Sequence, residues 1–276
     1  MSGLPEYLRG AADLHVHSAP DVVARRYDDI DLAREMAAAG FGAILLKSHS
    51  APTSARAYLT RKVVPEIKVF GGLVLNDTIG GFNVSAVRAA LAVGAKEIWM
   101  PTHSAHNHKV HHKEHGVLSV FDGHGELRHD VQSIVRLIAN ADAILGTGHI
   151  SPEEASALIR FAHTEGVSKI LVTHPEWGAT YYTPALQREL TVFGAIFERC
   201  FVSTTHRCGH VPFATIENAI ADVGVNSTIL TSDLGQPDTP PPAEGMIEYA
   251  ERMRAAGFTQ DDVRRMMVTH PRHLLE

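Results

Sequence analysis

Short β-rich segments alternate with longer helical patterns eight times along this chain, and this alternation limits its fold more than any other feature. Each predicted strand is a nearly continuous apolar run that ends in polar residues. The predicted strands span residues 12–17, 42–47, 68–75, 97–101, 143–148, 169–173, 200–204 and 227–232. The predicted helices span residues 29–39, 53–64, 83–93, 130–140, 152–165, 184–198, 212–223 and 243–256, followed by a last helix over 260–267. Eight such units predict a parallel sheet covered by helices and closed as a (β/α)₈ TIM barrel.

The length of the chain fits one barrel. Its 276 residues, 45% of them hydrophobic, suffice for one large core, so we expect a single domain over residues 1–276. A doubly wound open sheet is the alternative, but no glycine-rich phosphate loop follows any predicted strand. One long insertion, residues 103–129, separates the fourth strand from its helix, and its first part is rich in histidine.

Composition excludes several classes of partner. The net charge is −6, and the basic residues are scattered, so we expect neither nucleic acid nor an anionic membrane surface as a partner. No apolar run is long enough to span a bilayer and no signal peptide is evident, so a cytoplasmic location is expected. The two cysteines, Cys200 and Cys208, are most simply ordinary thiols. A homo-oligomer is compatible with this composition.

Polar side chains with metal-binding chemistry follow almost every predicted strand. In a barrel of this type the carboxyl ends of the strands build the active site. His15 and His17, two apart on the first strand, point to one face, and imidazole nitrogens are good ligands for zinc-like ions. Singly, each such residue is explained equally well by a turn cap or by solvation, but the set at matching strand ends predicts a metal site. Its members are His15, His17, Lys47, His49, Asn76, Thr102, His103, His149, His174, Thr205, His206 and Asp233.

This pattern resembles the amidohydrolase superfamily of metal-dependent barrel hydrolases. That superfamily has His-x-His on its first strand, histidines after strands five and six, and an aspartate after strand eight. The matching residues in order are His15, His17, His149, His174 and Asp233. The resemblance covers essentially the whole chain and implies that these five residues bind a divalent ion. Among its members, an uncharacterised amidohydrolase-related group is most similar, on runs such as Leu-Lys-Ser-His at 46–49.

The chain departs from that superfamily at strand four. Members with two ions usually carry a carboxylated lysine or a glutamate there, whereas this chain has Thr102 and His103, so a standard bridged pair of ions is not expected. We expect one or two ions, zinc first and manganese as the alternative. Lys47 either is a displaced carboxylated ligand or, as we favour, binds a carboxylate or phosphate of the substrate. His49 and His103 are predicted to contact the substrate.

The resemblance implies a hydrolase that uses a metal-activated water to cleave an amide, lactone or ester of a small, potentially anionic molecule. Asp233 would be catalytic, accepting the proton of the water. A phosphoesterase is the second hypothesis, because the segment before His49 also resembles the polymerase-and-histidinol-phosphatase family, although Leu234 replaces one of that family's ligands. A non-catalytic metal-binding or anion-binding barrel is the third.

Six histidines fall within residues 103–115 of the insertion. One hypothesis makes this segment a lid that brings His103 and one other histidine to the site. For His108 to His115 we favour the other hypothesis, a solvated loop.

Overall fold

The computed structural model describes residues 3–276 and contains an eight-stranded parallel sheet whose strand order follows the sequence. The strands are β1 (Ala12–His17), β2 (Ala43–Lys47), β3 (Lys68–Val74), β4 (Glu97–Trp99), β5 (Ile144–Gly146), β6 (Ile170–Thr173), β7 (Ala195–Cys200) and β8 (Thr228–Thr231). The two edges of the sheet meet where Asp233 N donates to His15 O at 2.7 Å and His17 N donates to Leu234 O at 2.8 Å. The predicted (β/α)₈ barrel is therefore confirmed.

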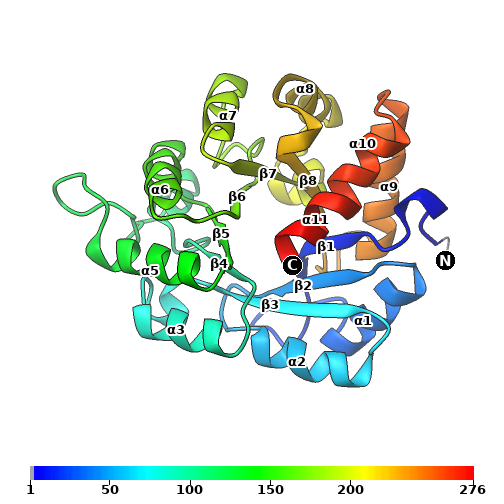
Figure 1. Ribbon diagram of the computed structural model, residues 1–276, viewed down its shortest axis with the longest axis horizontal. Helices are drawn as coiled ribbons and strands as arrows, with labels where there is room; N and C mark the ends of the chain where they lie inside the picture. The colour runs from blue at the N-terminus through cyan, green and yellow to red at the C-terminus, as the bar shows by residue number, and fades with distance from the viewer. Residues whose placement is uncertain (1–2) are drawn as a thin grey trace.

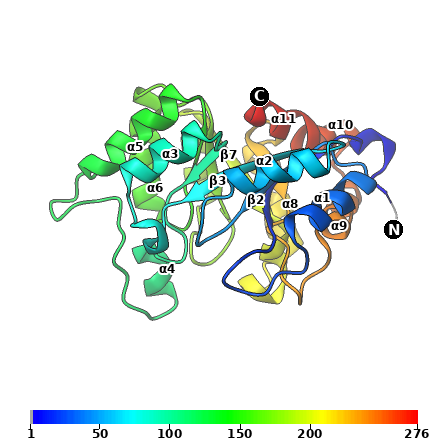
Figure 2. The same ribbon diagram turned by 90° about the horizontal axis from the view of Figure 1, so that it is seen from below.

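Helices surround the sheet on its outer face (Figure 1). The helices are α1 (Asp29–Ala38), α2 (Ser54–Val63), α3 (Val84–Ala92), α4 (His106–His111), α5 (His129–Asn140), α6 (Pro152–Thr164), α7 (Pro184–Thr191), α8 (Phe213–Val223), α9 (Pro242–Ala255), α10 (Gln260–Arg264) and α11 (His270–Leu275), of which α4 and α11 lie at opposite ends of the barrel rather than around it (Figure 2). Local sequence sets their ends. The side chain of Ser151 accepts from Glu154 N at the start of α6, for example, and Gly166, at φ +82°, ends the turn after that helix.

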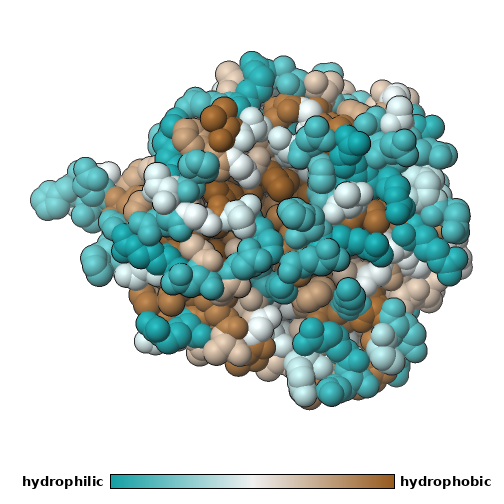
Figure 3. Space-filling view, viewed as in Figure 1, coloured by the Kyte–Doolittle hydropathy of each residue, from teal (hydrophilic) through white to brown (hydrophobic). Residues whose placement is uncertain are grey.

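Two layers of apolar side chains hold the barrel together. The outer layer lies between the strands and the helices. The inner layer fills the lower barrel, where Trp99 is fully buried among residues that include Leu14 and Leu45. Trp99 fits because the neighbouring strands supply glycine beside it: a Cβ atom at Gly72 would lie 2.5 Å from its ring. Figure 3 shows one face of the molecule, on which hydrophilic residues predominate and hydrophobic residues form patches among them.

The loops that carry the candidate site gather at one end of the barrel. Figure 2 shows α4 at this end together with the loops after β1 and β8, whereas α11 and the C-terminus lie at the opposite end. Among residues 3–276, no helix is long and apolar enough to cross a membrane.

The prediction for strand seven was wrong. Residues 200–204 were expected to form the strand and 184–198 its preceding helix, but α7 ends at Thr191 and β7 is Ala195–Cys200. Gly194, at φ +83°, ends the helical turn, and the segment that follows is extended and pairs with β6 and β8. Residues 201–204 instead form a 3₁₀ turn.

Two smaller corrections concern the insertion and the C-terminus. The insertion is not entirely loop, because it contains α4. The last helix does not end at residue 267: a π-helical turn over Arg265–Thr269 joins α10 to α11.

Candidate metal centre

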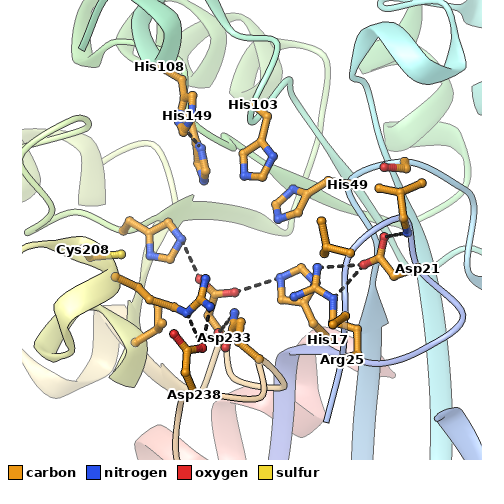
Figure 4. Close-up of a pocket in the computed structure, with 18 of the residues that line it drawn as sticks. His17, Asp21, Arg25, His49, His103, His108, His149, Cys208, Asp233 and Asp238 are labelled. Atoms are coloured by element: carbon orange, nitrogen blue, oxygen red, sulfur yellow. Dashed lines mark hydrogen bonds and ion pairs between the residues drawn. The ribbon is translucent and has the colours of Figure 1, made fainter. Parts of the chain in front are cut away.

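The carboxylate of Asp233, directly after β8, is surrounded by three imidazoles. His15 Nε2 and His17 Nε2 lie 3.0 and 2.9 Å from its Oδ1 atom, and His174 Nε2 lies 3.2 Å from its Oδ2 atom. Figure 4 shows His17 pointing toward Asp233. Asp233 and His174 both have left-handed backbones, at φ +50° and +53°. Such conformations are uncommon for residues other than glycine and concentrate at functional sites.

Asp13 ties the first strand to the last at this point. Its carboxylate accepts from His15 N at 3.2 Å and from Ser232 N at 3.0 Å. Burial raises the pKa of Asp13 to about 6, although hydrogen bonds from Ser232 oppose that effect. Asp13 thus positions the segment that precedes Asp233. The sequence alone did not predict this role.

The other nitrogen of His15 contacts a second carboxylate. His15 Nδ1 lies 3.1 Å from Glu198 Oε2 on β7, and both side chains are fully buried. Cys200 Sγ is 3.7 Å from the same nitrogen. One ligand atom from each of His15, His174, Cys200 and Asp233 lies within 4.8 Å of the others. Glu198 and Cys200 were not predicted as site residues, because Glu198 was assigned to a helix and Cys200 was interpreted as an ordinary thiol. The apolar run at 195–197 directly after Gly194 was the available signal for the strand.

Charges in this cluster oppose the effects of burial. Burial raises the pKa of Asp233, but the charge of His15 and hydrogen bonds from His15, His17 and His174 hold it well below its usual value. Burial lowers the pKa of His15, but the Asp233 and Glu198 carboxylates raise it to about 9. The pKa of His17 falls to about 3 because of burial and the nearby charge of Arg25. The carboxylate is thus ionised and attracts cations.

Lys47 lies beneath this cluster rather than in the open cavity. Its side chain is 1% exposed, and its ammonium lies 2.9 Å from His15 Nε2 and 5.1 Å from the centre of the Trp99 ring. Lys47 therefore places a positive charge next to a candidate ligand atom. The residues within 3–276 that line the cavity described below do not include it.

His149 does not contact Asp233. Its Nδ1 atom lies 2.9 Å from His108 Nδ1 of α4, and its Nε2 atom is buried without a hydrogen-bond partner. His108 lies on α4, is half-buried and lines the cavity, so the prediction of a solvated loop was wrong for this residue, whereas His112 borders the cavity but is exposed to solvent.

His49 and His103 face each other between the imidazoles around Asp233 and the pair formed by His108 and His149. Their rings stack with centroids 3.9 Å apart, and His49 also stacks on His17 at 4.8 Å. Thr102 Oγ1 lies 2.8 Å from His49 Nδ1, and Asn76 holds Thr102 by donating to that oxygen and accepting from Thr102 N. The predicted strand-end residues of β2, β3 and β4 thus form one network.

A cavity of about 710 Å³ opens above these residues. Its rim comes from the loop after β1, where Arg25 and Asp21 form a buried ion pair at 2.7 Å, and from the loop after β8, where Asp238 pairs with Arg207 at 2.5 Å. His206 lies at this exposed rim, 3.0 Å from Asp238. Leu234 replaces a metal ligand of the polymerase-and-histidinol-phosphatase family, and its side chain is fully buried in the apolar core.

Comparison with known proteins supports the fold. A model described as a family of unknown function (DUF6282) matches residues 10–198, so Asp233 lies beyond the matched segment. No curated protein is similar in sequence. An amidohydrolase from Pseudomonas aeruginosa is similar in structure at 10% identity, with 98% of this chain and 97% of that chain covered and a TM-score of 0.67.

Two further structures have the same architecture. A lactonase from Listeria monocytogenes has 12% identity, 98% and 95% coverage of the two chains, and a TM-score of 0.66. An organophosphorus hydrolase from Deinococcus radiodurans has 14% identity, 97% and 93% coverage, and a TM-score of 0.62. The expected resemblance to the amidohydrolase superfamily is therefore confirmed for the fold.

Proposed function

Because the chain belongs to the DUF6282 family, whose function is unknown, we propose a function from the chemistry of its own site: a metal-dependent hydrolase of small molecules. The observation that carries this proposal is the convergence of His15, His17 and His174 on the Asp233 carboxylate. Three imidazole nitrogens and one carboxylate oxygen form a ligand set that suits zinc, and manganese is the alternative.

These residues fit a divalent ion in their hydrogen bonding as well. The Nε2 atoms of His15, His17 and His174 all lie at the Asp233 carboxylate, and Glu198 holds the ring of His15 through its other nitrogen. A carboxylate that holds the far side of a ligating histidine is the usual supporting contact of metal sites. When bound, the ion would lower the pKa of a water molecule toward about 7 and polarise the oxygen of the scissile group.

The protein's own groups have distinct tasks in this mechanism. Asp233 is ionised at neutral pH, so its carboxylate accepts the proton of the attacking water and returns it to the leaving group. His49 and His103 line the cavity, and the bond from Thr102 to His49 Nδ1 leaves Nε2 of that ring to orient a substrate oxygen. A cavity of about 710 Å³ suits a small molecule.

We propose an amide, lactone or ester as the bond cleaved, because the fold is shared with proteins named amidohydrolase and lactonase. Lys47 acts in this proposal as a fixed positive charge below the site rather than as a direct substrate ligand, since it is buried against His15.

The test combines metal analysis with turnover. Purified protein, never exposed to chelator, is analysed for metal and assayed on panels of lactones, esters, amides and phosphate esters. We expect a stoichiometric transition metal, hydrolysis of at least one carboxyl derivative, and a loss of about 10²–10⁴-fold in turnover for Asp233→Asn in a folded protein. Asp261→Asn, an exposed change on α10 outside the lining of the cavity, is the matched control and should retain activity.

Two results would contradict the proposal. One is a metal content that stays unchanged in the variant with both His15→Ala and His17→Ala. The other is a metal-bound protein in which Asp233→Asn turns over as fast as the original, because the carboxylate would then have no part in the chemistry.

A further inference from the structure

A buried ion pair lies behind the loop that joins β6 to α7, residues 174–183. The guanidinium of Arg199 on β7 pairs with the carboxylate of Glu176 in this loop, and their side chains are 0% and 4% exposed. Arg199 also donates to Gln187 Oε1 on α7 at 2.9 Å, and Gln187 donates in turn to Tyr182 O at 3.0 Å. Arg199 therefore holds the loop near its start directly and near its end through Gln187.

The same loop carries two side chains of the candidate site. His174 begins the loop and contacts the Asp233 carboxylate, and Trp177 lines the cavity above it. Glu176, between these two residues, instead lines a separate cavity beside α7 and α8. The loop thus presents His174 and Trp177 to the candidate site and Glu176 to the helices outside the barrel.

Trp177 is a centre of contacts on this side of the cavity. Its ring packs against those of His108, His149 and His174, with centroids 5.7, 5.1 and 5.8 Å away. Its side chain is buried. A shift of Trp177 would therefore change the cavity wall that these imidazoles form with it.

Hydrogen bonds make the loop one compact unit. His174 N donates to Glu198 O of β7 at 3.2 Å. His174 O accepts from Thr180 Oγ1 at 2.6 Å and from Trp177 N at 3.2 Å. Because His174 and Trp177 are joined in this way on either side of Glu176, a displacement of Glu176 would displace them as well.

Stability alone does not require charges at Arg199 and Glu176. Taking two charges out of water is costly, and replacing a buried ion pair by apolar side chains of similar volume is often neutral or stabilising. An arginine remains charged throughout the accessible pH range, so the cost persists. The attraction between the two groups is strong only when the loop brings the carboxylate to the guanidinium, whereas apolar side chains pack against each other in several arrangements.

We propose that Arg199 and Glu176 are positioning residues for the candidate site. Their pairing fixes the loop so that His174 reaches Asp233 and Trp177 forms part of the cavity wall. This placement does not depend on the proposed hydrolase; only its effect on metal binding rests on that function.

The test separates the position of the loop from the stability of the barrel. Trp99 and Trp177 are the two tryptophans of the chain, so protein labelled with 5-fluorotryptophan gives two fluorine NMR resonances, which Trp177→Phe assigns. The variant with both Arg199→Met and Glu176→Leu replaces the ion pair by apolar side chains. We expect its midpoint of urea unfolding to stay close to that of the original protein. In metal-free protein the Trp177 resonance should shift by more than its linewidth, whereas the Trp99 resonance should not.

An exposed ion pair supplies the matched control. Arg160→Met with Glu189→Leu makes the same two changes in a pair that joins α6 to α7 at the surface, and it should move neither resonance. The dissociation constant for zinc, measured by competition with a chromophoric chelator, should rise at least about 10-fold in the buried-pair variant and not in the control, because His174 contacts Asp233.

An unshifted Trp177 resonance in the folded buried-pair variant would overturn the proposal. Equal shifts of both resonances would also overturn it, because the pair would then stabilise the barrel in general. If the apolar pair fails to fold, Glu176→Gln removes the charge alone and is judged by the same two resonances. A Trp177 shift with unchanged zinc affinity would overturn the role of the pair for His174. An original protein that binds no zinc would contradict the proposed hydrolase, whereas the fluorine spectra of metal-free protein would still decide on the positioning.

Discussion

Glu198→Gln tests whether the buried carboxylate of β7 tunes the metal centre through His15. Glu198 Oε2 lies 3.1 Å from His15 Nδ1, and neither side chain is exposed to solvent. Burial raises the pKa of Glu198, but the charge of His15 and their hydrogen bond lower it overall, so the group is ionised. Glutamine keeps the shape and an acceptor oxygen but removes the charge that fixes the proton on Nδ1 and leaves Nε2 as the ligand atom.

The expected loss follows from the nature of this contact. A hydrogen bond to a charged group contributes about 1.5–3 kcal/mol, and removing such a supporting carboxylate commonly lowers metal affinity about 10–100-fold. That range corresponds to about 1.4–2.8 kcal/mol, so the two estimates agree. We therefore expect the dissociation constant for Zn²⁺ at the Asp233 site to rise about 10–100-fold.

Competition with a chromophoric chelator measures this constant, and Glu97→Gln provides the control. Glu97 is also fully buried inside the barrel, but neither of its oxygens has a hydrogen-bond partner within residues 3–276. Burial, followed by the charge of Glu198, raises its pKa well above the usual value. Glutamine therefore resembles the neutral form that is already present, and zinc affinity should not change. Equal affinities in the original protein and Glu198→Gln would refute the reasoning, as would equal losses in both variants.

Two further predictions concern stability. In metal-free protein, burial lowers the pKa of His103 to about 4 and of His108 to about 3, so the unfolded chain takes up protons first as the pH falls. The free energy of unfolding should therefore fall as the pH is lowered from about 6.5 to about 4. Urea denaturation should show a weaker decline in the variant with both His103→Asn and His108→Asn. An unchanged decline would contradict the assignment of this pH dependence to the two histidines. Gly71→Ala should lower the free energy of unfolding by at least about 1–3 kcal/mol, because its Cβ atom would lie 2.5 Å from the Thr53 carbonyl carbon, whereas Gly123→Ala, with no atom within 4 Å, should be neutral in the same assay.

The fold was predictable because its signal is repeated. Eight apolar runs with helical segments between them leave few arrangements in which every strand is buried on both faces. The error at strand seven shows the limit of this signal. Residues 195–204 contain two adjacent segments with strand-like composition, and only the pairing of Ala195–Cys200 with β6 and β8 decides between them. Such pairing is a tertiary contact, so local propensity does not determine it.

The sequence predicted which residues lie near one another at the candidate site, but not which of them contact Asp233 and which do not. The rule that strand ends converge brought His15, His17, His174 and Asp233 into one list, and the structure places them within hydrogen-bonding distance. The same rule could not separate His149 from them. That separation depends on the left-handed turn at His174 and on the position of α4, which the sequence does not encode as a periodic pattern.

The charge of the cavity differs from the charge of the chain, and this difference bears on the substrate. Three carboxylates line the described cavity, but Asp21 pairs with Arg25 and Asp238 pairs with Arg207, whereas Asp233 has no arginine partner among residues 3–276 and contacts His15, His17 and His174. A divalent ion at Asp233 would make that centre positive, and Lys47 adds to the effect from below. The net charge of −6 is a total for the chain, and exposed charges are screened beyond about 8–10 Å in physiological salt. A chain whose overall charge disfavours polyanions can therefore hold a cavity that favours a small anion.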